Sequence, residues 1–226
     1  MIDFTPSKND QAAFDRARAA GLICRDHARY FDENEHEMAP DTLPEAAEFD
    51  ASHPEVPLPG EGDSSFPVRM MRLTMINYWG DYTVRLHRDT GGLGNAALSA
   101  AGTDEQKEKW GSLCLSMAIT EPGCGSDPSR VATTAVLDEE TDEWVINGEK
   151  IFVTTGIRAD AVVLWATLDK SAGRGGIKSF LVEKGTAGFD VPHKEKKLGI
   201  RADDTAAYVF SDCRIPRGNL LGGDET

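Results

Sequence analysis

The spacing of apolar residues along the chain changes near residue 113. Before this point apolar residues recur at helical spacing, and the sequence predicts helices over residues 10–38, 42–49, 68–88, 95–101 and 104–110. The clearest pattern puts an apolar stripe on the third of these helices, made of Val68, Met71, Met75, Trp79, Tyr82 and Leu86. Thr103 and Gln106 have the spacing of a capping box, which predicts that the last helix begins there.

After residue 113 the apolar period shortens toward two. The sequence predicts strands over residues 114–120, 131–137, 144–146, 150–154, 161–168, 178–183 and 206–210. Asn147-Gly148, between two of these strands, is a strong signal for a two-residue hairpin turn. Short strands separated by turn residues are typical of an antiparallel barrel or sandwich. We therefore predict an α+β chain, with an all-helical domain over residues 1–112 and a β-domain over residues 113–226.

The charged residues restrict the classes of partner. Lys and Arg number 24 against 38 Asp and Glu, which gives a formal net charge of −14. This excess of acid argues against binding of nucleic acid or anionic lipid, both of which need clustered basic residues. We found neither an apolar run long enough for a membrane span nor the pattern of a secretory signal, so we expect a cytoplasmic protein without membrane insertion. Cys24, Cys114, Cys124 and Cys213 form no C-x-x-C pair, and reduced thiols are the expected state.

Other familiar motifs are incomplete. Residues 173–179 suggest a phosphate loop, but Ile177 stands where that motif needs a Gly directly before Lys. The acidic run 32–37 has Glu37 where a calcium loop needs Gly, and a solvated helix end explains its charge. The five histidines have no metal-binding spacing, and no G-x-S-x-G segment is present. The sequence thus predicts neither a metal site nor a hydrolase triad.

The most informative segment is the turn that follows the strand predicted at 114–120. Pro122, Gly123 and Gly125 let the main chain approach a ligand, and successive N–H groups there could bind an anion. Thr120 and Ser126 add hydroxyl groups that both donate and accept. The segment suits a ligand that carries phosphate. An ordinary structural turn is the alternative, because the same residue types dominate turns.

Five ordered segments resemble one protein family. Residues 118–127 read A-I-T-E-P-G-C-G-S-D and closely resemble the T-E-P-x-x-G-S-D signature of the acyl-CoA dehydrogenases. The other four segments are 147–156 (N-G-E-K-I-F-V-T-T-G), 179–189 (S-F-L-V-E-K-G-T-A-G-F), 197–201 (K-L-G-I-R) and 210–222 (F-S-D-C-R-I-P-R-G-N-L-L-G). The helical half fits this family more loosely, through residues 102–107.

The resemblance implies an enzyme that binds FAD and oxidises an acyl-CoA to the 2,3-enoyl-CoA, with hydride transfer to flavin N5. The strand before the turn is expected beside the isoalloxazine, with Thr120 at its pyrimidine edge and Gly125 and Ser126 at the pyrophosphate. A second flavin wall is expected from 152–154, with the Thr154 hydroxyl near N5. The cofactor-binding residues implied are Met117, Ala118, Ile119, Thr120, Gly125, Ser126, Phe152, Val153 and Thr154, and the substrate-binding residues implied are Ser126 and Arg174.

Plainer explanations exist for several of these residues. Phe152 could be a core aromatic residue and Thr154 an ordinary strand residue. Arg174 could be a solvated loop charge. Gly91–Gly94 suggests the acyl pocket by family analogy, although a helix break explains these glycines equally well.

Three departures from the family pattern matter, and the third is decisive for activity. Phe152 stands where Trp is usual, which keeps a flat apolar surface without the indole N–H, and Cys124 stands where Ala is common. The sequence stops near Gly222, where the family's C-terminal four-helix domain with its catalytic Glu is expected to begin. We therefore expect no catalytic base in this chain, and Glu121 belongs to the turn instead.

These expectations lead to three hypotheses. The first is an acyl-CoA dehydrogenase chain that is truncated, or that is one subunit of a heteromeric enzyme in which another chain supplies the missing domain. Its expected partners are electron-transfer flavoprotein or a similar electron acceptor, in a homo- or hetero-oligomer (a heterotetramer is plausible). The second is a non-catalytic flavin-binding or structural partner subunit. The third is a related flavin monooxygenase or oxidase, which the intact T-E-P-x-x-G-S-D segment disfavours.

Overall fold

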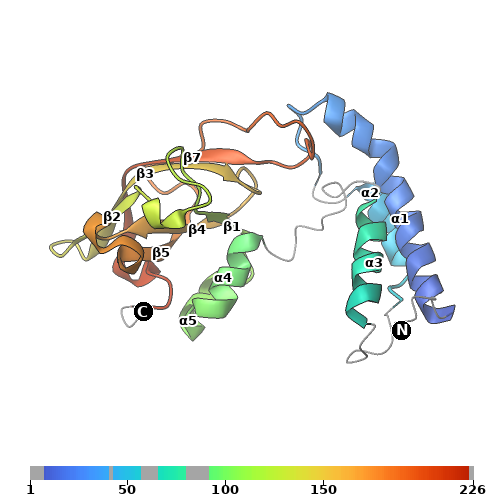
Figure 1. Ribbon diagram of the computed structural model, residues 1–226, viewed down its shortest axis with the longest axis horizontal. Coiled ribbons are helices and arrows are strands. Elements are labelled where there is room, and N and C mark those ends of the chain that lie inside the picture. The colour runs from blue at the N-terminus through green and yellow to red at the C-terminus, as the bar shows by residue number, and fades with distance from the viewer. Residues whose placement is uncertain (1–7, 41–42, 57–65, 80–91, 224–226) are drawn as a thin grey trace. The chain divides into compact units, whose positions relative to one another are not determined.

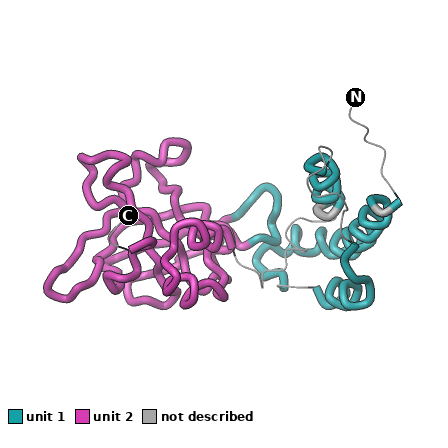
Figure 2. Tube along the Cα trace, turned by 90° about the horizontal axis from the view of Figure 1, so that it is seen from below, with its two compact units in different colours: residues 1–87, 196–203 teal, residues 88–195, 204–226 magenta. Residues whose placement is uncertain are grey.

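The computed structural model describes residues 8–40, 43–56, 66–79 and 92–223. The chain divides into two compact units (Figure 2). Unit 1 comprises residues 1–87 and 196–203, and unit 2 comprises residues 88–195 and 204–226. None of the described helices is long and apolar enough to cross a lipid bilayer.

The described residues of unit 1 form three helices, which are α1 (Lys8–Glu33), α2 (Pro44–Ser52) and α3 (Phe66–Tyr78). Helix α1 buries Phe14 and Phe31. Its Asp10 is also buried, and its carboxylate pairs with Arg69 of α3 at 2.8 Å. The segment 196–203 joins this unit, because Ala202 packs in the same apolar cluster as Phe31.

The apolar stripe predicted on α3 is not buried. Val68, Met71, Met75 and Trp79 are between 37% and 69% exposed. In the packing of α3 against α1, Arg69 pairs with Asp10 and the Arg72 guanidinium lies 4.9 Å from the Phe14 ring centroid. Trp79 of the stripe contacts α1 through the Arg25 guanidinium, which lies 4.4 Å from its ring centroid. Tyr82 and Leu86 lie outside the described residues.

Unit 2 contains a curled, seven-stranded sheet (Figure 1). Its strands are β1 (Leu115–Ala118), β2 (Thr134–Asp138), β3 (Glu143–Val153), β4 (Ala161–Thr167), β5 (Ile177–Glu183), β6 (Phe189–Asp190) and β7 (Ala206–Pro216). The order is β1-β4-β2-β3-β7-β6, and β5 pairs with β4. The predicted α+β class, helices followed by a curled sheet, is confirmed. The strand pairing is mixed rather than wholly antiparallel, because β4 pairs in parallel with β1 and β2.

The larger of two apolar clusters in unit 2 lies on one face of the long strands. It contains Trp144 and Ile146 of β3, Phe180 of β5, and Tyr208 and Phe210 of β7. Each of these side chains is less than 9% exposed. Because a strand alternates its side chains between two faces, this packing also decides which residues of β3 point away from the core.

The hairpin predicted at Asn147-Gly148 is wrong. Strand β3 runs through both residues, and its register against β7 shifts between Ile146 and Gly148. Asn147 exchanges hydrogen bonds with Asp212 of β7. Gly148 is at φ 152°, and a Cβ there would collide with Thr133. The Asn-Gly pair thus forms a bulge, which needs the same backbone freedom as a turn.

Two further helices, α4 (Leu93–Ala101) and α5 (Asp104–Trp110), group with the sheet in unit 2. The predicted capping box is present, since Thr103 Oγ1 accepts from the N–H of Gln106 and Gln106 Oε1 accepts from the N–H of Thr103, both at 3.2 Å. Gly94 lets α4 lie against β1, because a Cβ there would collide with the Ser116 carbonyl. The domain boundary at residue 112 stays a prediction.

Candidate functional site

Strand β1 leads into a closed turn. The N–H of Glu121 donates to the Cys124 carbonyl at 2.9 Å, and the N–H of Cys124 donates back to the Glu121 carbonyl at 3.1 Å. Gly123 and Gly125 have no positive φ, and a Cβ on either would meet no atom within 4 Å. The turn itself therefore does not require these glycines. Their effect is to leave its outer surface open to a close ligand.

The end of β3 adjoins this turn. The N–H of Ile151 donates to the Thr120 carbonyl at 2.9 Å. Phe152 follows at φ 60°, with 61% of its surface exposed. Thr154 is also exposed, and Thr155 has φ 60°. A bulky residue with positive φ is a backbone outlier, and such outliers cluster at functional sites.

A buried ion pair lies beneath this junction. Lys150 Nζ is 2.7 Å from Glu121 Oε1, and the two side chains are 0% and 5% exposed. Lys150 Nζ also donates to the Ile119 carbonyl at 3.1 Å. The Glu121 carboxylate accepts two more hydrogen bonds, from the N–H of Ala132 at 2.7 Å and of Thr133 at 3.0 Å.

The pKa values of the pair follow from these contacts. Burial by itself raises the pKa of Glu121, but the hydrogen bonds from Lys150, Thr133 and Ala132 outweigh it, so this pKa lies below its usual value. Burial lowers the pKa of Lys150, and Glu121 offsets only part of that effect. Four polar contacts thus hold one carboxylate and one ammonium where water does not reach.

The other candidate cofactor residues differ in burial. Ala118 and Val153 are 0% and 1% exposed, so only their main chain could meet a ligand. Met117, Ile119 and Thr120 are half-buried. Gly125 and Ser126 are exposed beside them on the turn. Because Phe152 and Thr154 are exposed, Phe152 is not a core aromatic residue, and the hydroxyl of Thr154 is accessible.

The two candidate substrate residues lie on neighbouring segments. Ser126 precedes the short 3₁₀ helix η2 (Pro128–Arg130), and Arg174 lies in η3 (Lys170–Gly176), which packs beside η2. Hydrogen bonds from Ser129 lower the pKa of Asp127, and the charges of Arg174 and Arg130 lower it further. Arg174 is exposed, so its guanidinium is available to a ligand at this end of the turn.

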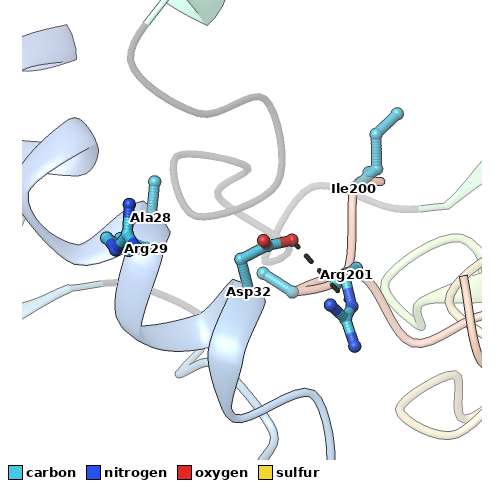
Figure 3. A pocket seen from close by; sticks show the side chains of 6 residues that line it. Ala28, Arg29, Asp32, Ile200 and Arg201 are labelled. Carbon is cyan, nitrogen blue, oxygen red and sulfur yellow. Dashed lines mark ion pairs between the residues drawn. The ribbon is translucent and has the colours of Figure 1, made fainter. Parts of the chain in front are cut away.

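The remaining features of interest lie elsewhere. A small pocket on unit 1 is lined by Ala28, Arg29 and Asp32 of α1 and by Ile200, Arg201 and Ala202 (Figure 3). Arg201 there pairs with Glu35 at 2.8 Å. This pocket contains none of the predicted site residues. Within the described ranges, no cluster of His, Cys, Asp or Glu could hold a metal ion.

Sequence reasoning missed the roles of three charged residues. Glu121 and Lys150 both stand in the quoted motifs, but their pairing across 29 positions carries no local signal. Asp204 is fully buried, and its Oδ2 accepts from the N–H groups of Ile157 and Arg158, both at 3.0 Å. These contacts hold the loop that follows Thr154.

The junction described above lies in a part of the chain that is similar to known proteins. Residues 116–213 match the family model described as acyl-CoA dehydrogenase, middle domain. Acryloyl-CoA reductase (NADH) of Anaerotignum propionicum is 43% identical over 132 residues, which cover 56% of this chain and 34% of that protein. The short-chain specific mitochondrial acyl-CoA dehydrogenase of Sus scrofa is 46% identical over 127 residues, which cover 54% of this chain and 30% of that protein.

A solved structure extends the likeness to the helices. Butyryl-CoA dehydrogenase from Megasphaera elsdenii aligns with 98% of this chain at a TM-score of 0.72 and 27% identity, and the alignment covers 60% of that structure. The chain therefore spans about a third of the length of the two curated relatives in sequence, and about 60% of this neighbour in structure. The matched middle domain contains β1, the turn and the end of β3, and over this region the chain is similar to the middle domain of acyl-CoA dehydrogenases.

Proposed function

We propose that this chain binds FAD and takes part in the α,β-oxidation of an acyl-CoA thioester. The observation that carries the proposal is the junction of two motif segments, in which Ile151 hydrogen-bonds Thr120 while Phe152 beside it is exposed on a strained backbone. A planar apolar side chain held outward at an energetic cost needs a partner surface, and a flavin ring supplies one.

The residues present fit that cofactor. The open surface at Gly125 and the hydroxyl of Ser126 suit a pyrophosphate, and the Thr120 segment suits the ring edge. The exposed Thr154 hydroxyl could donate to a ring nitrogen, which favours the negative charge of the reduced ring. When bound, FAD accepts the hydride from the β-carbon, and the α-proton leaves to a carboxylate base. No residue of this chain is proposed as that base.

The acyl-CoA is proposed to meet the same turn. Ser126 and Arg174 lie on adjoining segments, and Arg174 is an exposed cation. A guanidinium binds phosphate groups through several N–H donors, so it suits the phosphates of CoA. The Asp127 carboxylate lies near Arg174 and Arg130 and reduces the positive charge of this segment.

The partners proposed follow from the family. We propose electron-transfer flavoprotein or a similar protein as electron acceptor, and a homo- or hetero-oligomer, such as a heterotetramer, as the working assembly. The alternative of a non-catalytic flavin-binding subunit shares the cofactor but not the reaction. Acryloyl-CoA reductase among the relatives is a reason to test the reaction in both directions.

The experiment begins with FAD titration of the purified chain, followed by flavin absorption. Dye reduction is then measured with short-chain acyl-CoAs, and the reverse reaction with enoyl-CoA and NADH, with the chain alone and with proteins that co-purify from its source. FAD binding with turnover in either direction supports the enzyme, and FAD binding without turnover supports the non-catalytic subunit. A chain that takes up no FAD under any of these conditions contradicts the proposal.

A further inference from the structure

The Glu121–Lys150 ion pair is buried, and it also contacts the main chain next to Thr120. Lys150 Nζ reaches both the Ile119 carbonyl and Glu121 Oε1, which are the main chain and side chain that flank Thr120. A buried ion pair rarely stabilises a fold more than apolar residues of the same shape. Fold stability alone therefore does not account for this pair.

The position of the pair in the chain suggests a different role. Lys150 stands two residues before Phe152, and the register of β3 against β7 shifts between Lys150 and Val153. Regular pairing between β3 and β7 is interrupted at this point, and Phe152, within the interruption, has the strained φ of 60°. Such strain persists only where the surroundings over-determine the conformation. The Lys150 side chain is one of these constraints on the upstream side.

A second buried carboxylate holds the downstream side. Asp204 binds the N–H groups of Ile157 and Arg158 at 3.0 Å, and its carbonyl accepts from the N–H of Gly156 at 2.8 Å. The strained turn therefore lies between two fixed points. The upstream fixed point is the Glu121–Lys150 pair, and the downstream one is Asp204. The Glu121–Lys150 pair also contacts the segment that contains Thr120, through the Ile119 carbonyl.

We propose that Glu121 and Lys150 are positioning residues for the flavin, which set the spacing between the Thr120 segment and the Phe152–Thr154 segment. The proposal rests on the proposed function, because it needs FAD at this junction. Neither side chain touches the ring, since both are buried. They act through the main chain of Ile119 and through the strand that leads to Phe152.

The test compares two variants of the full chain with the wild type. The double variant Glu121→Gln/Lys150→Met keeps the shape of both side chains and removes both charges, so that no charge is left buried alone. The control Ile146→Val trims a fully buried residue on the same strand, away from the junction. Three quantities are measured: the Kd for FAD, the visible absorption band of bound FAD, and the hydrogen exchange of the Ile151 amide.

The double variant is expected to bind FAD about tenfold more weakly, with an absorption band shifted toward that of free FAD. Its Ile151 amide is expected to exchange about tenfold faster even without FAD, because the Thr120 carbonyl is no longer held in place. The control is expected to stay within about twofold of the wild type in each quantity. If the double variant does not fold, Glu121→Asp replaces it, since it keeps the charge and shortens its reach.

The outcomes separate the two proposals. A double variant that matches the wild type in FAD affinity, absorption band and amide exchange overturns the positioning role and leaves FAD binding intact. Equal loss of affinity in the control and in the double variant also overturns it, because general destabilisation would then explain the effect. A wild-type chain that takes up no FAD overturns the proposed function and the positioning role together.

Discussion

Removal of the Lys150 ammonium tests whether its ion pair with Glu121 is the main electrostatic contact of the junction. At 2.7 Å and an effective dielectric constant of about 20, the attraction between the charges is about 6 kcal/mol. Lys150→Met forfeits this attraction but avoids the burial of the ammonium, which costs several kcal/mol. Loss of one partner of a buried pair usually costs about 3–5 kcal/mol. Because Ala132 and Thr133 still donate to Glu121, we expect a loss near the lower end, about 3 kcal/mol.

The assay is urea unfolding followed by tryptophan fluorescence, to which the buried Trp110 and Trp144 contribute. At about pH 7, Lys150→Met should lower the free energy of unfolding by about 3 kcal/mol, and Glu121→Gln/Lys150→Met should restore most of it. The difference between the two variants measures the cost of the unpaired carboxylate. A loss below about 1 kcal/mol in Lys150→Met would refute the reasoning, because the carboxylate would then not depend on its ammonium partner.

The pH dependence provides a second check on the same variant. In the wild type the pKa of Glu121 lies below its usual 4.5, so its stabilising contribution is present above that value and is lost as the pH falls through the folded-state pKa. Without Lys150, burial should raise the folded-state pKa above the unfolded value, and protonation then relieves the buried charge. The stability gap between wild type and Lys150→Met should therefore narrow as the pH falls from about 7 toward the usual pKa of Glu. A gap that stays constant would contradict the assignment of the loss to an unpaired charge.

Three further predictions concern backbone strain, close packing and a buried hydroxyl. Phe152→Gly should raise the free energy of unfolding by up to about 1 kcal/mol, because Gly adopts φ 60° without strain. The same variant should bind FAD more weakly. Urea unfolding measures the stability and FAD titration measures the affinity, and a variant less stable than the wild type would contradict the strain at Phe152. Gly94→Ala should destabilise the chain by about 2 kcal/mol, since the new methyl group meets the Ser116 carbonyl, whereas Ala97→Gly on the same helix should cost only about 1 kcal/mol. Burial raises the pKa of Tyr208 to about 12, so the stability that this hydroxyl contributes is present below about pH 10 and is lost as the pH rises through the folded-state pKa. Above about pH 10, the free energy of unfolding should therefore fall more steeply with pH in the wild type than in Tyr208→Phe. Equal slopes in the two proteins would contradict the raised pKa of Tyr208.

Sequence predictions were correct where the interacting residues are close in the sequence, and wrong where the structure depends on residues far along the chain. The capping box at Thr103 and Gln106 was correct because both partners lie within one helical turn. Asn147-Gly148 identified a place that needs unusual backbone freedom, but the choice between a turn and a bulge depends on β7, some 60 residues later. The apolar spacing on α3 predicted a helix correctly, but the stripe is exposed. The sequence pattern does not show that α3 pairs with α1 through Arg69 and Asp10, which lie 59 positions apart.

For the site, local sequence determined which residue types and which turn are present. The T-E-P-x-x-G-S-D segment and the strand that carries Phe152 could be found without a structure, because motif and periodicity are properties of neighbouring residues. The tertiary structure decided that these two segments adjoin and that Phe152 faces outward while Val153 faces the core. It also decided that Glu121 and Lys150 are buried together, since the mutual compensation of two charges depends on their distance in space and not along the chain.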